Sequence, residues 1–557
     1  MRVLTGTLGA GDDATGGLES TPVRQALVEA GPTAVPALRA LLAGSPSPAA
    51  ATSAAWVLGA LRAHEEAPGL VQAMRRGALP PAAALHALAG AGTGADVPVV
   101  LEFVADRSPV VRGEALGAAQ ALLDPTQPDG RAVEPLAAAL REARPSPAER
   151  ARIATLLGRT GARRAIPLLV ELTRAPDATL RIAAIDALGA LGAAAPDAAP
   201  AAAGEDATGA LLEAIASPDA SIRLHAATAL AEAGGAQARD ALLARLDGGD
   251  EVDRAALLTA LGGVLSRAPS DAAVARLSGA LSMAAGPERD ALAEALGRAP
   301  SAASVTALAN LARSDEAADR RAAATMSAAH PGDAAATALA RALVSDGDAG
   351  VRAQAAWALG SLGDASDLPR LAPVCRGADV DPAVDAVGAL GRIAARTARP
   401  DLGAAVCPLA SDLRPLVRAN ALAGLARAGA RCGDGSPERA VLASDPSEDA
   451  RQAAALAVAR GGTPEDARAL ERCARTDASS AVAAICRAGA AREAASPRTH
   501  AVLVYVVPEG SDAPRPGAAY AMRFADGLVR AGITDRRGAV FEPRAPEGDV
   551  TLRRPGR

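Results

Sequence analysis

A short segment recurs along most of this chain of 557 residues, and no other feature constrains the fold as strongly. Three clear copies begin at Asp177, Asp219 and Asp348. Each copy is an aspartate, two small residues, an aliphatic residue and an arginine, followed by Ala and Leu at helical spacing. Equivalent positions return mostly at steps of about 29 to 35 residues, a period typical of stacked helical pairs. The sequence therefore predicts roughly 15 helical hairpins over residues 18–495.

The repeat also contains the signals that begin and end a helix. Its aspartate is suited to the N-cap, where a carboxylate accepts hydrogen bonds from unpaired backbone N–H groups. Glycines that follow the Ala-Leu pattern, such as Gly189 and Gly360, are expected to end these helices as C-caps. A proline such as Pro167 fits the first turn of the second helix. Because one hairpin cannot bury its apolar face alone, the hairpins are expected to stack into an α-solenoid.

An arginine stands four residues after the aspartate in several copies. One interpretation is a row of arginines that binds a ligand. The other is a structural ladder of i,i+4 ion pairs and contacts between neighbouring repeats, worth about 0.3–0.5 kcal/mol per pair. The sequence favours the ladder, because the same pair marks the same helix start in each copy. The ladder residues are Asp177, Arg181, Asp219, Arg223, Asp250, Arg254, Asp348 and Arg352.

The scarcity of aromatic residues narrows the type of repeat. The chain has two Trp, two Tyr and three Phe, so Ala, Leu and Val must fill its interior. Tetratricopeptide repeats place aromatic residues at set positions, and ankyrin repeats carry a Thr-Pro-Leu-His signature. The chain cannot supply the first pattern and lacks the second.

Over about residues 20–490 the repeats resemble HEAT repeats of the short bacterial type named after phycobilisome lyases. The resemblance implies an all-α superhelical solenoid, HEAT/armadillo-like. It implies a non-catalytic scaffold for protein-protein interaction that presents an extended concave surface. The alternative that the family leaves open is a regulatory or lyase-like HEAT-repeat enzyme, since the phycobilisome enzymes attach bilins to cysteines.

Motifs for catalysis are missing from the sequence. There is no lysine, which excludes Schiff-base chemistry, and there is no nucleophile elbow or phosphate-binding loop. The five histidines are far apart; His64-Glu65 resembles one half of the iron-binding motif of HEAT-repeat hydroxylases, which need four such pairs. We therefore expect no catalytic, cofactor-binding or metal-binding residues, no cofactor, and a protein that is not an enzyme.

Charge and hydropathy restrict the partners. The 58 basic and 63 acidic residues give a net charge of -5 and are interleaved, whereas nucleic-acid binders need a clustered basic surface. No uncharged apolar run is long enough to span a membrane. The sequence therefore predicts one or more protein partners, no nucleic acid and no membrane span.

The five cysteines lie between Cys375 and Cys486, and they bear on the compartment. Each is either a small buried residue in a helix, or Cys407/Cys432 and Cys473/Cys486 form disulfides with Cys375 left over. The first 17 residues are expected to be a flexible start without a secretory signal, which favours the cytoplasm. Paired cysteines or a truncated start would instead indicate an extracytoplasmic location.

Composition changes after Pro497, where β-branched and aromatic residues become frequent. Residues 501–507 and 519–524 read as strands, and Asp526-Gly527 predicts a hairpin turn. Residues 499–557 are therefore expected to form a small β-sandwich-like domain. Its Thr534-Asp535-x-x-Gly538 and Pro546-x-Gly548 turns resemble those of carboxypeptidase-regulatory-like modules.

The first strand of this domain is continuously apolar, so we expect both of its faces to be covered. Phe524 and Phe541 are expected to fill the space between two sheets. The preceding segment is short and rich in Ala. We therefore expect the domain to pack on the last repeat, near Ile485 and Ala488. Its role there is to cap the apolar end of the solenoid, to serve as a docking module, or both.

Overall fold

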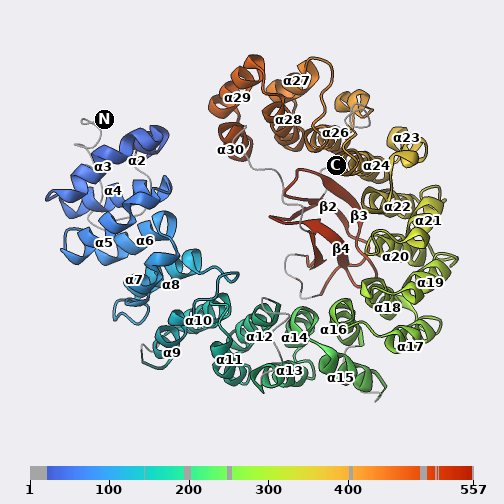
Figure 1. Cartoon of the computed structure of the whole chain (residues 1–557), viewed down its shortest axis with the longest axis horizontal. Coiled ribbons are helices and arrows are strands. Elements are labelled where there is room, and N and C mark those ends of the chain that lie inside the picture. The colour runs from blue at the N-terminus through green and yellow to red at the C-terminus, as the bar shows by residue number, and fades with distance from the viewer. Residues whose placement is uncertain are drawn as a thin grey trace. The chain divides into compact units, whose positions relative to one another are not determined.

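The computed structural model describes residues 22–142, 145–193, 202–247, 254–399, 405–489, 499–508, 511 and 513–554. The chain divides into two compact units, residues 1–264 and 265–557, here named the N-terminal unit and the C-terminal unit. Figure 1 shows their helices and strands in chain order. The expected flexible start, residues 1–17, lies outside the described residues.

Short helices follow one another in pairs through the N-terminal unit. They are α2 (Pro22–Glu29), α3 (Val35–Ala43), α4 (Pro48–Ala60), α5 (Ala67–Arg75), α6 (Pro81–Ala91), α7 (Val97–Leu101), α8 (Pro109–Leu122), α9 (Val133–Glu142), α10 (Pro147–Arg159), α11 (Ile166–Leu172), α12 (Ala178–Ala193), α13 (Ala202–Ala214), α14 (Ala220–Ala233) and α15 (Ala236–Asp247), and α16 (Arg254–Arg267) begins there. Even-numbered helices pack side by side from α4 to α14, so each hairpin contacts its neighbours.

The same pairing continues in the C-terminal unit, which ends in five strands. Its helices are α17 (Asp271–Leu281), α18 (Gly286–Arg298), α19 (Ala302–Leu311), α20 (Ala317–Ser327), α21 (Ala334–Leu343), α22 (Ala349–Leu362), α23 (Leu368–Arg376), α24 (Val380–Arg396), α26 (Pro415–Ala428), α27 (Ser436–Ser444), α28 (Glu448–Gly461), α29 (Pro464–Thr476) and α30 (Ser480–Ala488). Its strands are β1 (Thr499–Tyr505), β2 (Ala519–Arg523), β3 (Val529–Ile533), β4 (Ala539–Pro546) and β5 (Thr551–Arg553). The predicted helical solenoid with a small C-terminal β domain is confirmed.

The aspartate of the repeat caps its helix as predicted. Asp177 accepts a hydrogen bond from the backbone N–H of Leu180 at 2.8 Å, and Asp348 accepts one from Val351 at 2.9 Å. Asp219 caps α14 in the same way. Each cap satisfies donors that have no partner inside the helix, which fixes where the helix begins.

The glycine of the repeat has a different role from the one predicted. Gly189 lies inside α12 and Gly360 lies inside α22, so neither is a C-cap. A Cβ at Gly189 would stand 2.8 Å from the Cα of Ala229, and one at Gly360 would stand 3.0 Å from the Cα of Ala389. These glycines let neighbouring helices of the stack approach each other closely.

The disulfide interpretation of the cysteines is confirmed. Cys407 is bonded to Cys432, and Cys473 in α29 is bonded to Cys486 in α30. Cys375 is free and buried in α23, and burial raises the pKa of its thiol to about 12. The two bonds link consecutive elements near the end of the solenoid.

The β domain has two small antiparallel sheets, ordered β1-β4 and β3-β2-β5. The predicted hairpin is present: Arg523 pairs with Val529 across a turn in which Gly527 adopts a φ of 84°. The prediction for β1 is wrong, because Thr499 to Ala501 are exposed and Val502 to Tyr505 are only half-buried. β1 pairs with β4 alone among the described strands.

The predicted place of the β domain is also wrong. Its strands lie inside the curve of the C-terminal unit's helices, where β3 packs on α22, α24 and α26 (Figure 1). The main contacts of its strands are with these helices and not with α30, which contains Ile485 and Ala488. Phe524 does not fill only the space between sheets, since its ring stacks on Trp357 of α22 with centroids 5.6 Å apart. The physical reason is a set of buried polar groups on these helices that pair with groups of the β domain.

Candidate protein-binding surface

The helices that face the β domain form a continuous surface, here named the inner face of the C-terminal unit. They are α18, α20, α22, α24, α26 and α28 (Figure 1). A Leu-Gly pair recurs in several of them, as in Leu296-Gly297 and Leu359-Gly360. The leucine is buried, and the glycine contacts the next helix. The residue three before the glycine, here named the inner position, points to the β domain and is Glu294 in α18 and Trp357 in α22.

Two adjacent arginines of the β domain fit into carboxylates at one end of the inner face. Arg536 donates to Asp290 through its backbone N–H at 2.8 Å and to Asp319 through Nη2 at 2.6 Å. Arg537 donates from Nη2 to Glu294 at 2.7 Å. The three carboxylates are at most 4% exposed, and a buried charge is stable only when it is paired. Burial opposes ionisation of both arginines, but the carboxylates raise the pKa of each above its ordinary value.

The centre of the interface is a buried polar cluster around Trp357. Its indole Nε1 donates to Glu542 at 2.7 Å, and Arg530 donates to the same carboxylate oxygen at 2.9 Å. Arg530 also donates from Nε to Gln354 of α22 at 3.1 Å. The guanidinium of Arg392 lies 3.9 Å from the centre of the Trp357 ring, a cation–π contact. All five of these side chains are less than a tenth exposed.

The outer edge of β3 is completed by helix side chains instead of another strand. The Asn420 amide donates to the Val529 carbonyl at 2.7 Å and accepts from the Val529 N–H at 2.7 Å. Asp385 accepts from the Ala531 N–H at 2.9 Å. Burial raises the pKa of Asp385 well above its ordinary value. These contacts satisfy backbone groups that an unpaired edge strand would leave open.

At the far end of the interface, Arg427 of α26 pairs with Asp526 in the β2–β3 turn. Arg523 of β2 contacts Asp449 and Gln452 of α28. The β domain is therefore held by side chains from α18 to α28. We conclude that the inner face of the C-terminal unit binds a folded domain of its own chain.

The same repeat position is filled differently in the N-terminal unit. Glu114 stands three residues before Gly117 and its side chain is 26% exposed, whereas Glu294 is fully buried. Asp186 and Trp56 hold the equivalent positions in α12 and α4; Asp186 is 49% exposed and Trp56 is half-buried. Helices α4, α6, α8, α10, α12 and α14 are accordingly named the inner face of the N-terminal unit.

Histidines lie beside two of these carboxylates. The Nδ1 of His86 lies 3.2 Å from Glu114, and the Nδ1 of His225 lies 2.7 Å from Asp186. The hydrogen bond to Asp186 raises the pKa of His225 although burial opposes it. The inner face of the N-terminal unit therefore carries polar side chains that remain accessible to a partner.

The predicted ladder residues are placed at the repeat junctions. Among the described copies no ion pair joins the aspartate to the arginine four residues later. Instead, Arg223 donates to the Ser217 carbonyl at 2.9 Å, Arg352 donates to the Asp346 carbonyl at 2.7 Å, and Arg254 donates to the Leu246 carbonyl at 3.0 Å. The i,i+4 pairing is thus wrong, because the aspartate is committed to capping backbone N–H groups. Arg181 is half-buried in α12, and Asp250 lies outside the described residues.

The ladder between neighbouring repeats is present in the C-terminal unit. Arg352 pairs with Asp379 of the next repeat, and Arg321 lies 3.5 Å from Asp348. Closer pairs of the same kind join Arg320 to Asp346, Arg418 to Asp445, and Arg451 to Asp477, each at 2.8 Å. These arginines link one repeat to the next.

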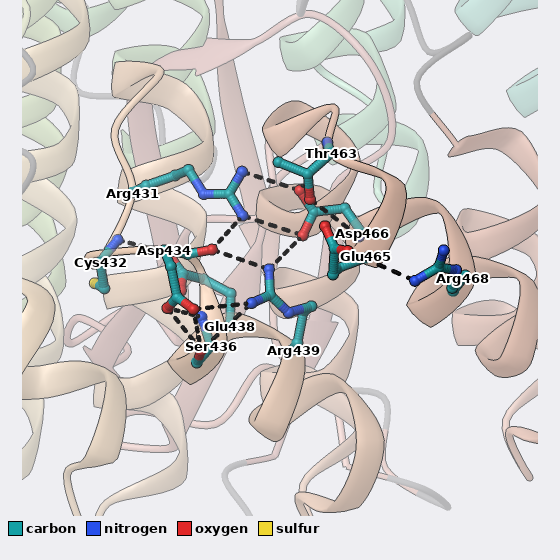
Figure 2. A network of polar contacts seen from close by, with 10 residues as sticks. All are labelled: Arg431, Cys432, Asp434, Ser436, Glu438, Arg439, Thr463, Glu465, Asp466 and Arg468. Carbon is teal, nitrogen blue, oxygen red and sulfur yellow. Dashed lines mark hydrogen bonds and ion pairs between the residues drawn. The ribbon is translucent and has the colours of Figure 1, made fainter.

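A larger network of this kind lies beside the first disulfide (Figure 2). Asp466 accepts hydrogen bonds from Arg431 and Arg439, both at 2.9 Å. Burial opposes ionisation, but these bonds and those from Thr463 lower the pKa of Asp466 to about 2. The N–H of Cys432 donates to Glu438 at 2.8 Å. Because its main charges are paired with one another, we interpret this network as structural.

No group of three or more His, Cys, Asp or Glu in the described part of the chain could hold a metal ion. His64 contacts the carbonyl of Ala91 at 3.0 Å. Within the described ranges no single helix is long and apolar enough to cross a membrane, although the bent pair Val23–Glu29 and Gly31–Ala43 passes that test by length and composition.

Comparison with known proteins identifies the repeats. Residues 133–204 and 321–391 match the family model of HEAT repeats. Among solved structures, importin beta in an ammonium sulfate condition is 15% identical, with 88% of this chain and 72% of that chain covered and a TM-score of 0.38. Human deoxyhypusine hydroxylase in complex with glycerol is 21% identical, with 60% of this chain and 96% of that chain covered and a TM-score of 0.21. No curated protein matches the chain.

The matched segments and the stacked helix pairs define the class of protein. The chain contains HEAT repeats, and its fold is that of a HEAT-repeat solenoid. Solenoids of this class are typical of protein-interaction scaffolds, since stacked repeats create long binding surfaces.

Proposed function

We propose that this protein is a non-catalytic scaffold for protein-protein interaction, and that its partner binds the inner face of the N-terminal unit. The observation that carries the proposal is the docking of the β domain. In the C-terminal unit the inner positions Glu294 and Trp357 bind a folded domain, and in the N-terminal unit the equivalent Trp56, Glu114 and Asp186 are accessible. The inner position therefore recurs in both units, and in the C-terminal unit it binds a domain of the same chain.

The alternative, a regulatory or lyase-like HEAT-repeat enzyme, has less support. Ionisable groups gather at the β-domain interface, but Arg530, Arg536 and Arg537 each donate to carboxylates there. Their charges are used to hold the interface. A catalytic acid or base needs a free site beside a substrate. We therefore propose that the protein is not an enzyme.

The finer resemblances belong to the same proposal. We assign the repeats to the short bacterial, phycobilisome-lyase-like type, and the β domain to the carboxypeptidase-regulatory-like modules. The turn at Asp535 supports the second assignment, since its carboxylate accepts from the N–H groups of Arg537 and Ala539, and Gly538 has a φ of 75°. The two disulfides favour an oxidising compartment.

A comparison of two variants of the full chain tests the binding surface. In the inner-face variant Trp56, Glu114 and Asp186 are replaced by Ala. In the control variant three exposed residues in or next to α5, α7 and α11 are replaced by Ala. They are Arg75, Glu102 and Glu171. Each chain is cross-linked in its native cells and purified, and bound proteins are quantified by mass spectrometry.

We expect the inner-face variant to lose at least ten-fold in captured partner, while the control variant captures as much as the unchanged chain. Melting curves of both variants check that the solenoid is intact. Equal capture by both variants, or capture of no protein above background by the unchanged chain, would contradict the proposal.

A further inference from the structure

A cavity of about 180 Å³ lies between α20 and the β domain. This volume exceeds what one ordered water occupies, so the cavity can hold a small organic molecule. One wall is a single face of α20, and the other is built from β2, β3, β4 and the turn that precedes β4. Both walls belong to the C-terminal unit.

The cavity exists because the β domain is held at a fixed distance from α20, and the side chains of α20 at that place are too short to fill the gap. Ala318 and Ala322 face the strands across this gap. The distance is set on one side by the ion pair of Arg536 with Asp319, and on the other by hydrogen bonds of Arg530 to Gln354. The β domain cannot move closer to the alanines without breaking these buried contacts.

Apolar side chains form much of the lining. Met326 contributes from α20, and Ile533 and Phe541 contribute from the β domain. Ile533 is 37% exposed, one of the few large apolar residues of the described chain that are not covered. An apolar body in the cavity would contact these side chains and gain the free energy of their removal from water.

Arg321 supplies an incompletely paired cation to the same cavity. Its Nη2 lies 3.5 Å from Asp348, at the long limit of a hydrogen bond, and that oxygen already accepts from Val351 at 2.9 Å. The Nε of Arg321 is buried and has no hydrogen-bond partner among the described residues. Because the contact with Asp348 is long, the terminal nitrogens of Arg321 keep donor capacity that an added acceptor can use.

The other charges at the cavity are already balanced. Asp290 is paired with Arg536, and Asp535 is paired with Arg537. Arg530 donates to Glu542 and to Gln354. The Nη1 of Arg537, which also lines the cavity, is buried without a hydrogen-bond partner in the described part of the chain. A ligand therefore meets unused guanidinium donors beside an apolar surface, and a carboxylate is the acceptor that matches a guanidinium best.

We propose that this cavity binds a small monocarboxylic acid. Its carboxylate accepts from Arg321, and its apolar body lies between Met326, Ile533 and Phe541. The site is separate from the inner face of the N-terminal unit, so it does not depend on the proposed scaffold function.

Titration calorimetry on the full chain tests the proposal with three probes that share one apolar body. Hexanoate carries the carboxylate, hexan-1-ol carries a neutral hydroxyl and hexylamine carries the opposite charge. We expect hexanoate to bind at least ten-fold more tightly than hexan-1-ol, and hexylamine not to bind. Equal binding of hexanoate and hexan-1-ol, or no binding of hexanoate, would overturn the proposal.

Variants locate the site. Arg321→Met keeps the aliphatic stem and removes the donors, so it should weaken hexanoate at least ten-fold and leave hexan-1-ol unchanged. Arg313→Met is the matched control on an exposed arginine and should leave both unchanged. Ala322→Phe should fill the cavity and abolish binding of both probes, with circular dichroism showing an intact fold. Unchanged hexanoate binding by Arg321→Met contradicts the proposal whether or not Ala322→Phe folds.

Discussion

The inner faces of the two units have the same helical framework but different surroundings. In the C-terminal unit Glu294 is fully buried and bonded to Arg537, whereas Glu114 at the same repeat position of the N-terminal unit is 26% exposed and lies beside a histidine. The difference shows that acidic side chains on the inner face of HEAT repeats can be buried when a second element, here the β domain, supplies arginines to pair with them. Without those charges, burial of the carboxylates would be strongly unfavourable.

Removal of residues 499–557 should have the largest effect. It removes the donors to Asp290 and Asp385 and leaves Asp319 with Arg289 but without Arg536, so the C-terminal unit should lose much of its stability. Hydrogen exchange measured by mass spectrometry should rise across α18 to α26 and stay unchanged across α4 to α12. Unchanged exchange in α18 to α26 would mean that the β domain is not part of the unit's interior.

Two arginine variants compare a buried ion pair with an exposed one. Arg537→Met breaks a pair with Glu294 in which both side chains are at most 5% exposed. Glu294 keeps its pair with Arg298, so the cost should be about 3 kcal/mol, the lower end of the range for a broken buried pair. Arg174→Met breaks a pair with Glu213 in which both are 62% exposed, and it should cost much less because water screens exposed charges. Local unfolding free energies from hydrogen exchange give both values. Similar losses of unfolding free energy in the two variants would contradict the proposed difference between the buried and the exposed ion pair.

The two tryptophans report on the two faces separately. Trp56→Phe leaves Trp357, which is 2% exposed, and Trp357→Phe leaves Trp56, which is half-buried. We expect blue-shifted emission and several-fold weaker quenching by acrylamide when Trp357 is the only indole. Equal quenching of the two variants would show that the β domain leaves Trp357 accessible.

Asp385→Asn should change how stability depends on pH. Burial raises the pKa of Asp385 in the folded chain, so its contribution is complete below the unfolded pKa of about 3.9 and is lost as pH rises through the folded pKa. The variant keeps an acceptor for the Ala531 N–H, and its melting temperature should fall less as pH rises. Arg530, Glu542 and Asp381 act electrostatically on this carboxyl.

Glu29→Gln is the matched control, because Glu29 is exposed on the other unit and hydrogen-bonds the neutral Gln25. It should leave the alkaline side of the melting profile unchanged. A profile of Asp385→Asn identical to that of the unchanged chain would show that Asp385 is not buried beneath β3.

The smallest effect is expected from Arg181→Ala, at about 1 kcal/mol or less. Leu188→Asp in the same helix places a charge where the side chain is 1% exposed, and it should disrupt the neighbouring repeats. Melting temperatures compare the two. Loss of partner capture by Arg181→Ala with unchanged melting would favour the ligand-binding interpretation of the arginines.

Features that depend on nearby residues could be predicted from the sequence. The caps at Asp219 and Asp348 and the hairpin at Gly527 each follow from a few consecutive residues. The bond between Cys473 and Cys486 spans only 13 positions, so facing helices bring them together. The repeat period indicated where along the chain the helices lie. It did not distinguish a glycine that ends a helix from a glycine at a contact between helices.

The docking of the β domain depends on residues that are far apart, and it was predicted in the wrong place. Arg536 and Asp290 are 246 positions apart, and Trp357 and Glu542 are 185 apart. A signal was nevertheless present, because Asp290 and Glu294 place two acids one turn apart within the Ala-Leu stripe of α18. Acids in such a stripe require a cationic partner, and Arg536 with Arg537 are adjacent cations in the β domain.

The span of the β domain fixes the number of repeats beneath it. The domain contacts α18 at one end and α28 at the other. Its length therefore has to match the length of the helical stack between these two helices. Loss or gain of one hairpin between them would shift Asn420 by a whole repeat relative to Val529. Evolution can therefore replace residues in this stretch more readily than it can change its length.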